Sequence, residues 1–419
     1  MRVADLETDV QDIDRIVVIH DFSTPRGGAS ALAVEAVRQY RALGYPVTMF
    51  TGDAANQELT ALGAEVIGLD SKSLLELPTI AALRKGYHNR ETAEQLSDWI
   101  TENDTPRTVY HMNNWSQILS PSVFAALRGV AERTLITCHD FFNSCPNGAF
   151  LHFGRSEACQ LKPLSTACCF SQCDRRSPLH KLWRLARQRH LNALADFKRA
   201  PYTFSFIHER MLERFREADF RLDDALAIRN PVRPWCTTRV HAEDNQGFLF
   251  VGRVGREKGA DLALEASAGA GQKLTLVGTG ELVESGGAMY PHAEFAGWRL
   301  ASEIAGYAAR ARALIVPSRW TEPFGLVILE AAMSGLPVIV SDQAYLAPEV
   351  DAMGIGKSFE LADPGSLQRT IEQFARDDEA VKRMSIAAYE TASNLCHTPQ
   401  SWAQAHIEQF HIKLGKLTA

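Results

Sequence analysis

Short apolar runs alternate with segments of helical periodicity along most of this 419-residue chain. The runs are bounded by glycine, proline and polar residues, which is typical of buried parallel strands. The expected strands are residues 15–20, 47–50, 64–69, 108–111, 134–137, 202–206, 247–253, 273–280, 313–316 and 337–341. The expected helices are residues 30–43, 260–268, 324–335, 365–375, 380–392 and 399–414. This alternation predicts an α/β fold with doubly wound parallel sheets.

A proline-punctuated stretch, Asn230-Pro231-Val232-Arg233-Pro234, divides the pattern into two parts. Proline interrupts helices and strands, and domain boundaries commonly fall in such segments. A chain of this length can form two α/β domains with full cores. We therefore expect a first domain over residues 1–230 and a second over residues 231–395.

The net charge of −6 and the 22% of charged residues are those of an ordinary soluble enzyme. They argue against a dedicated nucleic-acid binder, which needs a strongly basic surface. The segment from Met1 to Gln11 is polar and acidic, so we expect no signal peptide. No apolar run reaches the roughly 20 residues of a membrane-spanning helix. We expect a cytoplasmic protein with reduced cysteines.

One strand–turn–helix segment combines a glycine turn with two carboxylates. Glu322 lies just ahead of the expected helix, and Glu330 lies about two turns into it. The backbone N–H groups of Phe324, Gly325 and Leu326 lie at the positive end of that helix and suit a phosphate. The two carboxylates can then bind hydroxyl groups on either side of the phosphate, as a nucleotide-sugar requires. An amphipathic helix with two exposed acids is the alternative.

Two cations lie at the carboxyl end of the first strand of the second domain. Arg253 ends the apolar run, and Lys258 follows it in a tight turn. An arginine can bind a diphosphate with two parallel hydrogen bonds, and a lysine adds a point charge. We expect both in the cleft between the domains, because ligands of open α/β sheets bind outside the carboxyl ends of strands. Ordinary surface cations are the alternative.

Three strand ends of the first domain also carry candidate residues. Gly27 and Gly28 join the first strand to a helix, the unit that approaches phosphate closely, although a plain tight turn is the alternative. His139 ends another strand, where a histidine satisfied by hydrogen bonds is the alternative. Asn114 ends a third and is a candidate for binding an acceptor.

The segment around Glu322 and Glu330 resembles the Glu-x7-Glu signature of retaining glycosyltransferases with the GT-B fold, in particular glycosyltransferase family 4. Arg253 and Lys258, with their neighbouring glycines, are similar to the Gly-Arg…Lys-Gly motif of the same family. The resemblance implies two Rossmann-like domains that face each other across a cleft. It also implies a C-terminal helix, over residues 396–419, that crosses back onto the first domain.

The resemblance further implies a retaining hexosyltransferase and assigns roles to individual residues. In the family the first glutamate, here Glu322, contacts the donor sugar, and the second, here Glu330, contacts the nucleotide ribose. The two cations hold the donor diphosphate and stabilise it as it leaves. The other residues that the resemblance places at the donor are Gly27, Gly28, His139, Gly278 and Trp298. His139 is implied to point at the transferred sugar, and core packing is the alternative for Trp298.

The expected partners are a nucleotide-sugar donor and a saccharide or lipid-linked saccharide acceptor, in cell-surface polysaccharide synthesis. We expect no cofactor for catalysis, because the cleft motifs include no metal-binding Asp-x-Asp signature. Two alternatives stay open. One is a nucleotide-sugar epimerase of GT-B architecture, and the other is a non-catalytic partner in a polysaccharide assembly complex.

Six of the eight cysteines lie between Cys138 and Cys173. In a cytosolic protein such clustering indicates a metal more often than disulfides. The sequence predicts a structural zinc or iron–sulfur site that holds together an insert at about residues 138–176. The candidate ligands are Cys145, Cys159, Cys168, Cys169 and Cys173. A set of free buried thiols is the alternative.

A basic segment over residues 175–199 follows the insert, and its leucines and Trp183 recur at roughly helical spacing between the cations. A basic amphipathic helix of this kind suits an anionic membrane surface. Such a contact would place the protein peripherally at the inner face of the membrane. The alternative is a solvated helix whose apolar stripe packs on its own domain.

Overall fold

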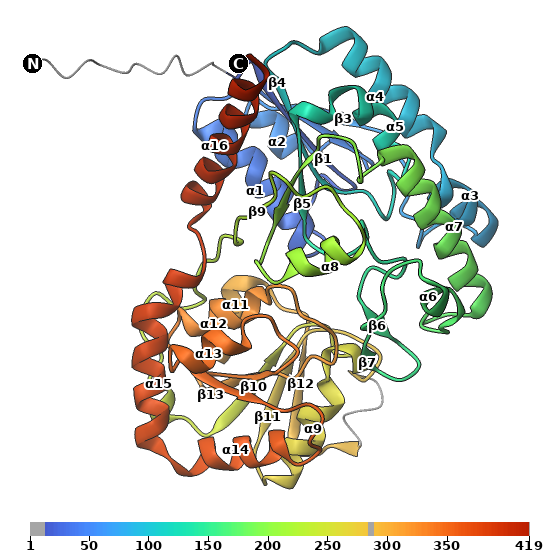
Figure 1. Cartoon of the computed structure of the whole chain (residues 1–419). Helices are drawn as coiled ribbons and strands as arrows, with labels where there is room; N and C mark the ends of the chain where they lie inside the picture. The colour runs from blue at the N-terminus through green and yellow to red at the C-terminus, as the bar shows by residue number, and fades with distance from the viewer. Residues whose placement is uncertain (1–12, 284–288, 419) are drawn as a thin grey trace, which may run out of the picture.

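The computed structural model describes residues 13–283 and 289–418, and the polar segment from Met1 to Gln11 lies outside them. Two α/β domains lie one beside the other, each with a parallel sheet covered by helices (Figure 1). The parallel α/β architecture predicted from the alternation of patterns is confirmed. Among the described helices, none has the length and apolar character needed to cross a membrane.

The first domain contains a seven-stranded sheet in the order β3-β2-β1-β4-β5-β8-β9, and every neighbouring pair is parallel. Its strands are β1 (Arg15–His20), β2 (Val47–Thr51), β3 (Glu65–Gly68), β4 (Thr108–Asn114), β5 (Thr134–Cys138), β8 (Thr203–Phe206) and β9 (Leu226–Ala227). Its main helices are α1 (Gly28–Ala42), α2 (Gln57–Ala61), α3 (Thr79–Tyr87), α4 (Arg90–Asn103), α5 (Val123–Leu127), α7 (Pro178–Ala195) and α8 (Met211–Glu217). The short strand β9 adds an edge that the apolar pattern did not predict.

The second domain contains a six-stranded parallel sheet in the order β12-β11-β10-β13-β14-β15. Its strands are β10 (Gly247–Val251), β11 (Leu274–Val277), β12 (Ala293–Gly297), β13 (Ala311–Val316), β14 (Val338–Ser341) and β15 (Gly356–Phe359). Its main helices are α9 (Ala260–Gly269), α11 (Ala301–Ala308), α12 (Leu326–Ala332), α13 (Ala347–Ala352), α14 (Ser366–Arg376) and α15 (Asp378–Thr391). All six residues of β13 are buried, as expected of a strand with helices on both faces.

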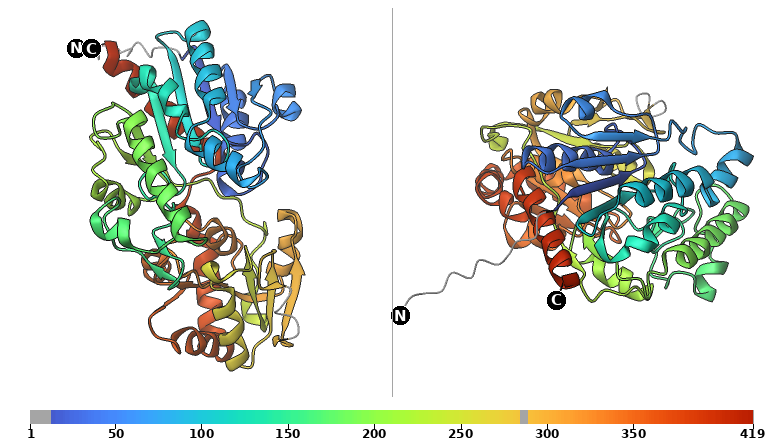
Figure 2. Two further views of the ribbon diagram at one scale, coloured as in Figure 1. Left: turned by 90° about the vertical axis from the view of Figure 1, so that its right-hand side faces the viewer. Right: turned by 90° about the horizontal axis from the view of Figure 1, so that it is seen from above.

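The last helix, α16 (Pro399–Thr418), returns to the first domain (Figures 1 and 2). Its Trp402 and Phe410 are fully buried in one apolar cluster with Tyr40 of α1. Where the chain crosses between the domains, the backbone N–H of Val232 donates to the carbonyl of His397 at 3.1 Å. The two domains are therefore joined by two crossing segments that are bonded to each other.

The cysteine-rich insert lies between β5 and α7 and has structure of its own. It contains an antiparallel pair, β6 (Leu151–His152) and β7 (Glu157–Ala158), and a short helix, α6 (Thr166–Phe170). The turn before β6 places Phe150 in the core, where its ring packs edge-on against Phe141 with 5.1 Å between centroids. The insert is thus anchored to the first domain by apolar packing.

Helix α7 does not simply bury its apolar residues and expose its basic ones, as its amphipathic pattern indicated. Leu185 and Leu191 are buried against the domain, but so are the charged side chains of Lys181 and Arg187. Arg187 donates to the carbonyl of Ser116 at 2.7 Å, which satisfies one buried donor. The leucines near the start of the helix point to solvent instead. The apolar stripe therefore packs on its own domain in part, through Leu185 and Leu191, while Leu179 and Leu182 stay exposed.

Candidate active site

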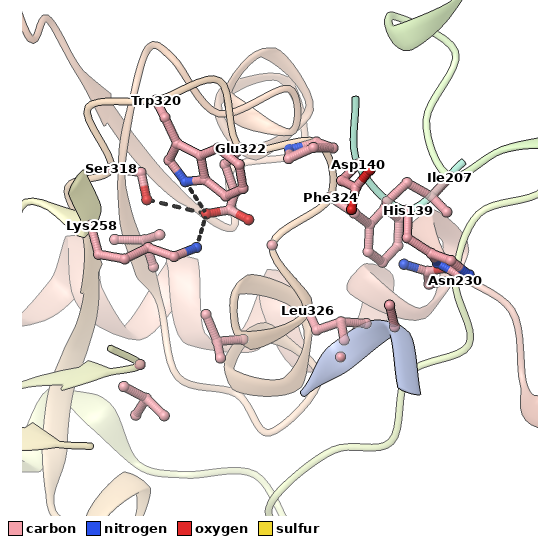
Figure 3. A pocket seen from close by; sticks show the side chains of 18 of the residues that line it. His139, Asp140, Ile207, Asn230, Lys258, Ser318, Trp320, Glu322, Phe324 and Leu326 are labelled. Atoms are coloured by element: carbon pink, nitrogen blue, oxygen red, sulfur yellow. Dashed lines mark hydrogen bonds and ion pairs between the residues drawn. The ribbon is translucent and has the colours of Figure 1, made fainter. Parts of the chain in front are cut away.

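A pocket of about 290 Å³ lies between the two domains, at the carboxyl ends of strands from both sheets. The first domain contributes Gly28, Ala29, Leu32, His139, Asp140, Ile207 and Asn230. The second contributes residues after β10, residues after β13 and the start of α12, including Lys258, Ser318, Trp320, Glu322, Phe324, Gly325 and Leu326. Figure 3 shows Lys258, Ser318, Trp320 and Glu322 on one side of the pocket, and His139, Asp140, Ile207 and Asn230 on the other side beside Phe324.

Three donors converge on one carboxylate oxygen in the second domain (Figure 3). Glu322 is buried, and its Oε2 pairs with Lys258 Nζ. The same oxygen accepts hydrogen bonds from Trp320 Nε1 at 3.1 Å and from Ser318 Oγ at 3.2 Å. The ammonium of Lys258 also lies 4.8 Å from the centre of the Trp320 ring, within range of a cation–π contact. Lys258 and Glu322 are therefore held in fixed positions at the pocket wall.

Gly325 shapes the turn that leads into α12. Its φ of +64° is in the left-handed region, which residues that have a Cβ rarely adopt. A Cβ at this position would lie 2.8 Å from Ile328 Cδ1 and 3.2 Å from Glu322 Cγ. The helix begins at Leu326 and is seven residues long, shorter than the segment that the apolar spacing predicted. A glycine is required here because the turn must pass close to the carboxylate cluster.

Glu330 lies within α12, behind the pocket wall. Burial raises the pKa of its carboxyl from 4.5 to about 7, and a hydrogen bond with the Trp235 side chain opposes that rise. Trp235 belongs to the crossing segment between the domains, so the second glutamate of the motif contacts the linker. Glu330 is close to half-protonated at neutral pH, whereas Glu322 is paired with a cation.

The first-domain side of the pocket carries a neutral histidine beside a carboxylate. Burial, with smaller effects from the charges of His20 and His406, lowers the pKa of His139 to about 3. His139 Nε2 donates to Asn113 Oδ1 at 2.9 Å, so Nδ1 carries the free lone pair. Nδ1 is buried and makes no hydrogen bond to the described residues. A ligand hydroxyl is the kind of group that would satisfy it.

Asp140 was not among the residues that the sequence singled out. It lines the pocket, and burial raises the pKa of its carboxyl to about 6. Its Oδ1 accepts from the backbone N–H of Phe142 at 2.9 Å, and Asn114 Nδ2 lies 3.4 Å from Oδ2. Asn114 does not line the pocket itself and supports Asp140 from behind. The position of Asp140 directly after a strand was the signal that could have identified it.

Four other expected residues, Gly27, Arg253, Gly278 and Trp298, are not among the residues that line the pocket. Arg253 is exposed, and its Nε pairs with Glu257 Oε1 at 2.9 Å. Gly27 precedes Gly28 of the pocket lining and caps α1. Gly278 lies at the end of β11, where a Cβ would be only 1.8 Å from the carbonyl oxygen of Gly252. Trp298 is 64% exposed after β12, so core packing does not explain it.

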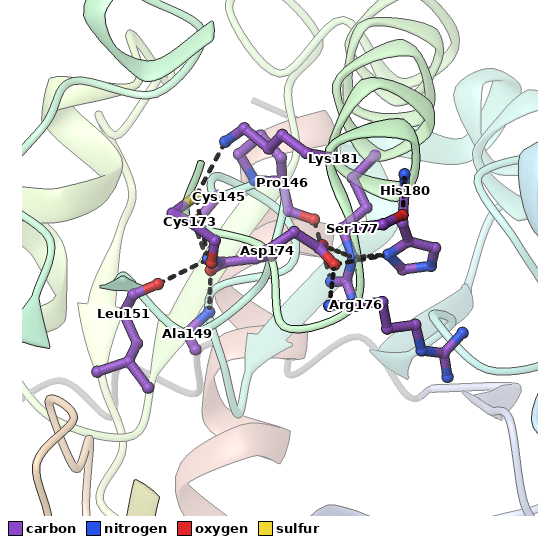
Figure 4. Close-up of polar contacts among 12 residues, drawn as sticks. Cys145, Pro146, Ala149, Leu151, Cys173, Asp174, Arg176, Ser177, His180 and Lys181 are labelled. Carbon is purple, nitrogen blue, oxygen red and sulfur yellow. Dashed lines mark hydrogen bonds and ion pairs between the residues drawn. The ribbon is translucent and has the colours of Figure 1, made fainter. Parts of the chain in front are cut away.

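The described residues do not show the expected metal site. The described residues contain no group of three or more His, Cys, Asp or Glu side chains that could hold a metal ion. Figure 4 shows the reason: the ammonium of Lys181 lies against these thiols, 3.0 Å from Cys173 Sγ, and it also lies 3.8 Å from Cys168 Sγ. The Cys145 thiol donates to Asn147 Oδ1 at 3.2 Å instead of facing a shared centre. Cys159 and Cys169 are likewise free thiols. A cation among the thiols does not fit a tetrathiolate, so we derive no chemistry through a metal here.

Residues 238–391, which lie in the second domain, match the family model described as Glycosyl transferases group 1. A relative from Klebsiella pneumoniae, named an uncharacterized 41.2 kDa protein in cps region, is 34% identical over 126 residues. That stretch covers 29% of this chain and 34% of the relative. The chain spans about a third of the length of the curated relatives it matches.

Solved structures resemble the whole chain. Sucrose-phosphate synthase from Thermosynechococcus elongatus has a TM-score of 0.70 at 16% identity, over 96% of this chain and 100% of that chain. Alr3699/HepE from Anabaena, solved in complex with UDP-glucose, has a TM-score of 0.64 at 16% identity, over 94% of this chain and 98% of that chain. The chain therefore has the GT-B fold, and this expectation is confirmed.

Proposed function

We propose that this chain is a retaining glycosyltransferase, a hexosyltransferase that moves a sugar from a nucleotide-diphosphate-sugar to an acceptor hydroxyl. The observation that carries the proposal is the Lys258–Glu322 pair at the wall of an interdomain pocket, within a domain that matches Glycosyl transferases group 1. A neighbour of the same fold is solved with UDP-glucose, which supports a nucleotide-sugar as the donor class.

Lys258 stabilises the departing diphosphate in this proposal. Its ammonium is oriented by Glu322 and Trp320 before any ligand binds, so little reorganisation is needed as negative charge develops. Arg253 is the residue after Gly252, which lines the pocket. In this proposal its side chain gives up the ion pair with Glu257 and binds the diphosphate instead. The three donors to Glu322 all reach Oε2, and Oε1 is the oxygen that binds a hydroxyl of the donor sugar.

The transfer step is a substitution at the anomeric carbon. The bond from that carbon to the diphosphate oxygen breaks, and the nucleotide diphosphate leaves with the electron pair. The acceptor oxygen bonds to the carbon from the same face, and its proton passes to the departing diphosphate. His139 Nδ1 accepts a hydrogen bond from a hydroxyl of the transferred sugar, because the imidazole is neutral. Asp140 accepts one from the acceptor.

The acceptor in this proposal is a saccharide or a lipid-linked saccharide, and the process is cell-surface polysaccharide synthesis. The Klebsiella relative, whose name places it in a cps region, supports this assignment.

The test combines thermal shift and donor hydrolysis across UDP-, GDP- and ADP-sugars. We expect one nucleotide series to stabilise the protein and to lose its sugar slowly. Lys258→Ala should slow transfer by about 10²–10³-fold, which is typical of a lost transition-state charge. Arg256→Ala is the matched control, since Arg256 lies in the same turn but not in the pocket lining.

Three outcomes would count against the proposal. Near-wild-type turnover in Lys258→Ala would remove the assigned role of that ammonium. Release of an isomerised free sugar from the nucleotide, with no acceptor present, would indicate an epimerase. No response to any donor would indicate a non-catalytic partner in an assembly complex.

A further inference from the structure

We propose that the outer surface of the first domain, at the starts of α3 and α7, binds an anionic lipid bilayer. We call this surface the apolar platform and define it by five residues: Leu75, Ile80, Phe170, Leu179 and Leu182. Figures 1 and 2 show α3, α6 and α7 on the flank of the first domain, away from α16.

The platform holds the four most exposed large apolar side chains of the described residues. Phe170 is 80% exposed, Leu179 79%, Ile80 74% and Leu75 72%, and no other large apolar side chain in residues 13–283 and 289–418 exceeds 66%. The fifth platform residue, Leu182, is 61% exposed, less than Met289 and Trp298 elsewhere in the chain. Single exposed leucines are normal, but a group of this kind marks an interaction surface.

Three contacts hold together the helices that carry or adjoin the platform residues. Trp183 Nε1 donates to the carbonyl of Leu83 at 3.0 Å, and the Tyr87 ring stacks on His190 with 4.4 Å between centroids. These pairs ascend along both helices, so α3 and α7 run in the same direction and their first turns lie together. Lys181 Nζ lies 3.8 Å from Cys168 Sγ, which holds α6 against the start of α7.

The outer face of α7 is mostly apolar. Its exposed positions are Pro178, Leu179, Leu182, Ala186, Arg189 and Ala193, and from Leu179 onward they recur at intervals of three and four residues. The opposite face buries Lys181, Arg187 and Gln188 together with Leu185, Leu191 and Ala195. A helix on a solvated surface normally exposes its cations and buries its leucines. Burial of two cations while leucines stay in water is unfavourable, and a bilayer that covers the leucines offsets that cost.

The charge around the platform matches anionic headgroups. Arg176 and Arg189 are exposed at or near α7, and Lys72 and Arg84 are exposed at or near α3. Arg175 is exposed as well, but it pairs with Glu281 at 2.9 Å. Helix α7 contains no acidic residue. Apolar side chains surrounded by cations bind anionic bilayers by two additive effects, insertion and attraction.

The nearby acids are already paired. Asp174 is buried against Arg184 and His180, at 2.9 Å and 3.0 Å, and Glu76 lies 3.6 Å from Arg26. The field around the platform is therefore positive. A purely apolar protein partner would make no use of these cations.

Vesicle flotation of the full chain tests the proposal, with and without phosphatidylglycerol in phosphatidylcholine. We expect binding only to the anionic vesicles. Leu179→Ser with Leu182→Ser should lower the partition coefficient by at least about tenfold, because the inserted apolar carbons are lost. Arg176→Glu with Arg189→Glu should lower it by at least about 25-fold at low salt, at about fivefold for each charge.

The matched control is Ile412→Ser with Leu417→Ser, two exposed apolar residues of α16, and it should bind like the wild type. Circular dichroism melts confirm that each variant folds. Equal binding of the wild type and the leucine variant, or no binding to any vesicle, would overturn the proposal. A dimer by light scattering that the leucine variant dissociates would also overturn it, because the platform would then bind a second copy. Vesicle binding needs no sugar donor, so its failure leaves the proposed transfer reaction untouched.

Discussion

Replacement of Glu330 by glutamine should stabilise the protein at alkaline pH and leave it unchanged at acidic pH. The carboxyl has an ordinary pKa of 4.5, and burial raises it to about 7 in the folded chain. Between these two values the folded state binds a proton that the unfolded state has released. Stability therefore falls as the pH rises from 4.5 to 7, and the full cost is present above pH 7.

The size of the effect follows from the interval between the two pKa values. At about 1.4 kcal/mol for each pKa unit, the ionised carboxylate costs at most about 3 kcal/mol above pH 7. Glutamine has nearly the same shape, and its amide oxygen can accept from the Trp235 side chain. We therefore expect Glu330→Gln to gain about 1–3 kcal/mol at pH 8 and close to nothing at pH 4.5.

Urea titration of both proteins at pH 4.5 and pH 8 measures this difference. Glu265→Gln is the matched control, because Glu265 is exposed on α9 of the same domain. The reasoning is refuted if Glu330→Gln changes the free energy of unfolding equally at both pH values. It is also refuted if Glu265→Gln reproduces the pH-dependent gain.

Three further predictions concern the pocket and the insert. The rate of transfer should decline below about pH 6, where Asp140 is protonated and no longer accepts a hydrogen bond from a hydroxyl. Asp140→Asn should remove this acidic limb from the pH profile of kcat/KM. An unchanged limb in the variant would show that another group causes the decline. Gly325→Ala should lower the free energy of unfolding by about 1–2 kcal/mol in urea titrations because of its positive φ, and a wild-type midpoint would show that the turn adapts. Metal analysis of tag-free protein purified without oxygen should find less than one equivalent of zinc or iron, since Lys181 lies among the thiols; stoichiometric metal would show that this ammonium moves away.

The sequence determined the elements and the order in which they occur. Strands such as β1 and β13 are apolar over several consecutive residues, and a buried parallel strand needs that composition whatever surrounds it. The places of Glu322 and Lys258 near strand ends could be predicted for a related reason. Both lie at fixed short distances from a strand end, and strand ends of parallel sheets converge.

Only the tertiary structure decided which side chains meet. Trp320 and Ser318 join Lys258 on Glu322 because β10 and β13 are neighbours in the sheet, and strand order is not written in local periodicity. Asp140 became a pocket residue because the two domains face each other across it.

The insert and α7 show the same limit more strongly. The sequence shows that the cysteines cluster and that the following helix is rich in cations. It does not show that packing places Lys181 among the thiols and leaves two leucines of α7 exposed. Burial of a charge depends on partners outside its own helix, here Cys173 for Lys181 and the more distant Ser116 for Arg187. The local pattern of apolar and polar residues determines which helices and strands form. Which of their faces pack together depends on contacts between segments that only the folded chain brings together.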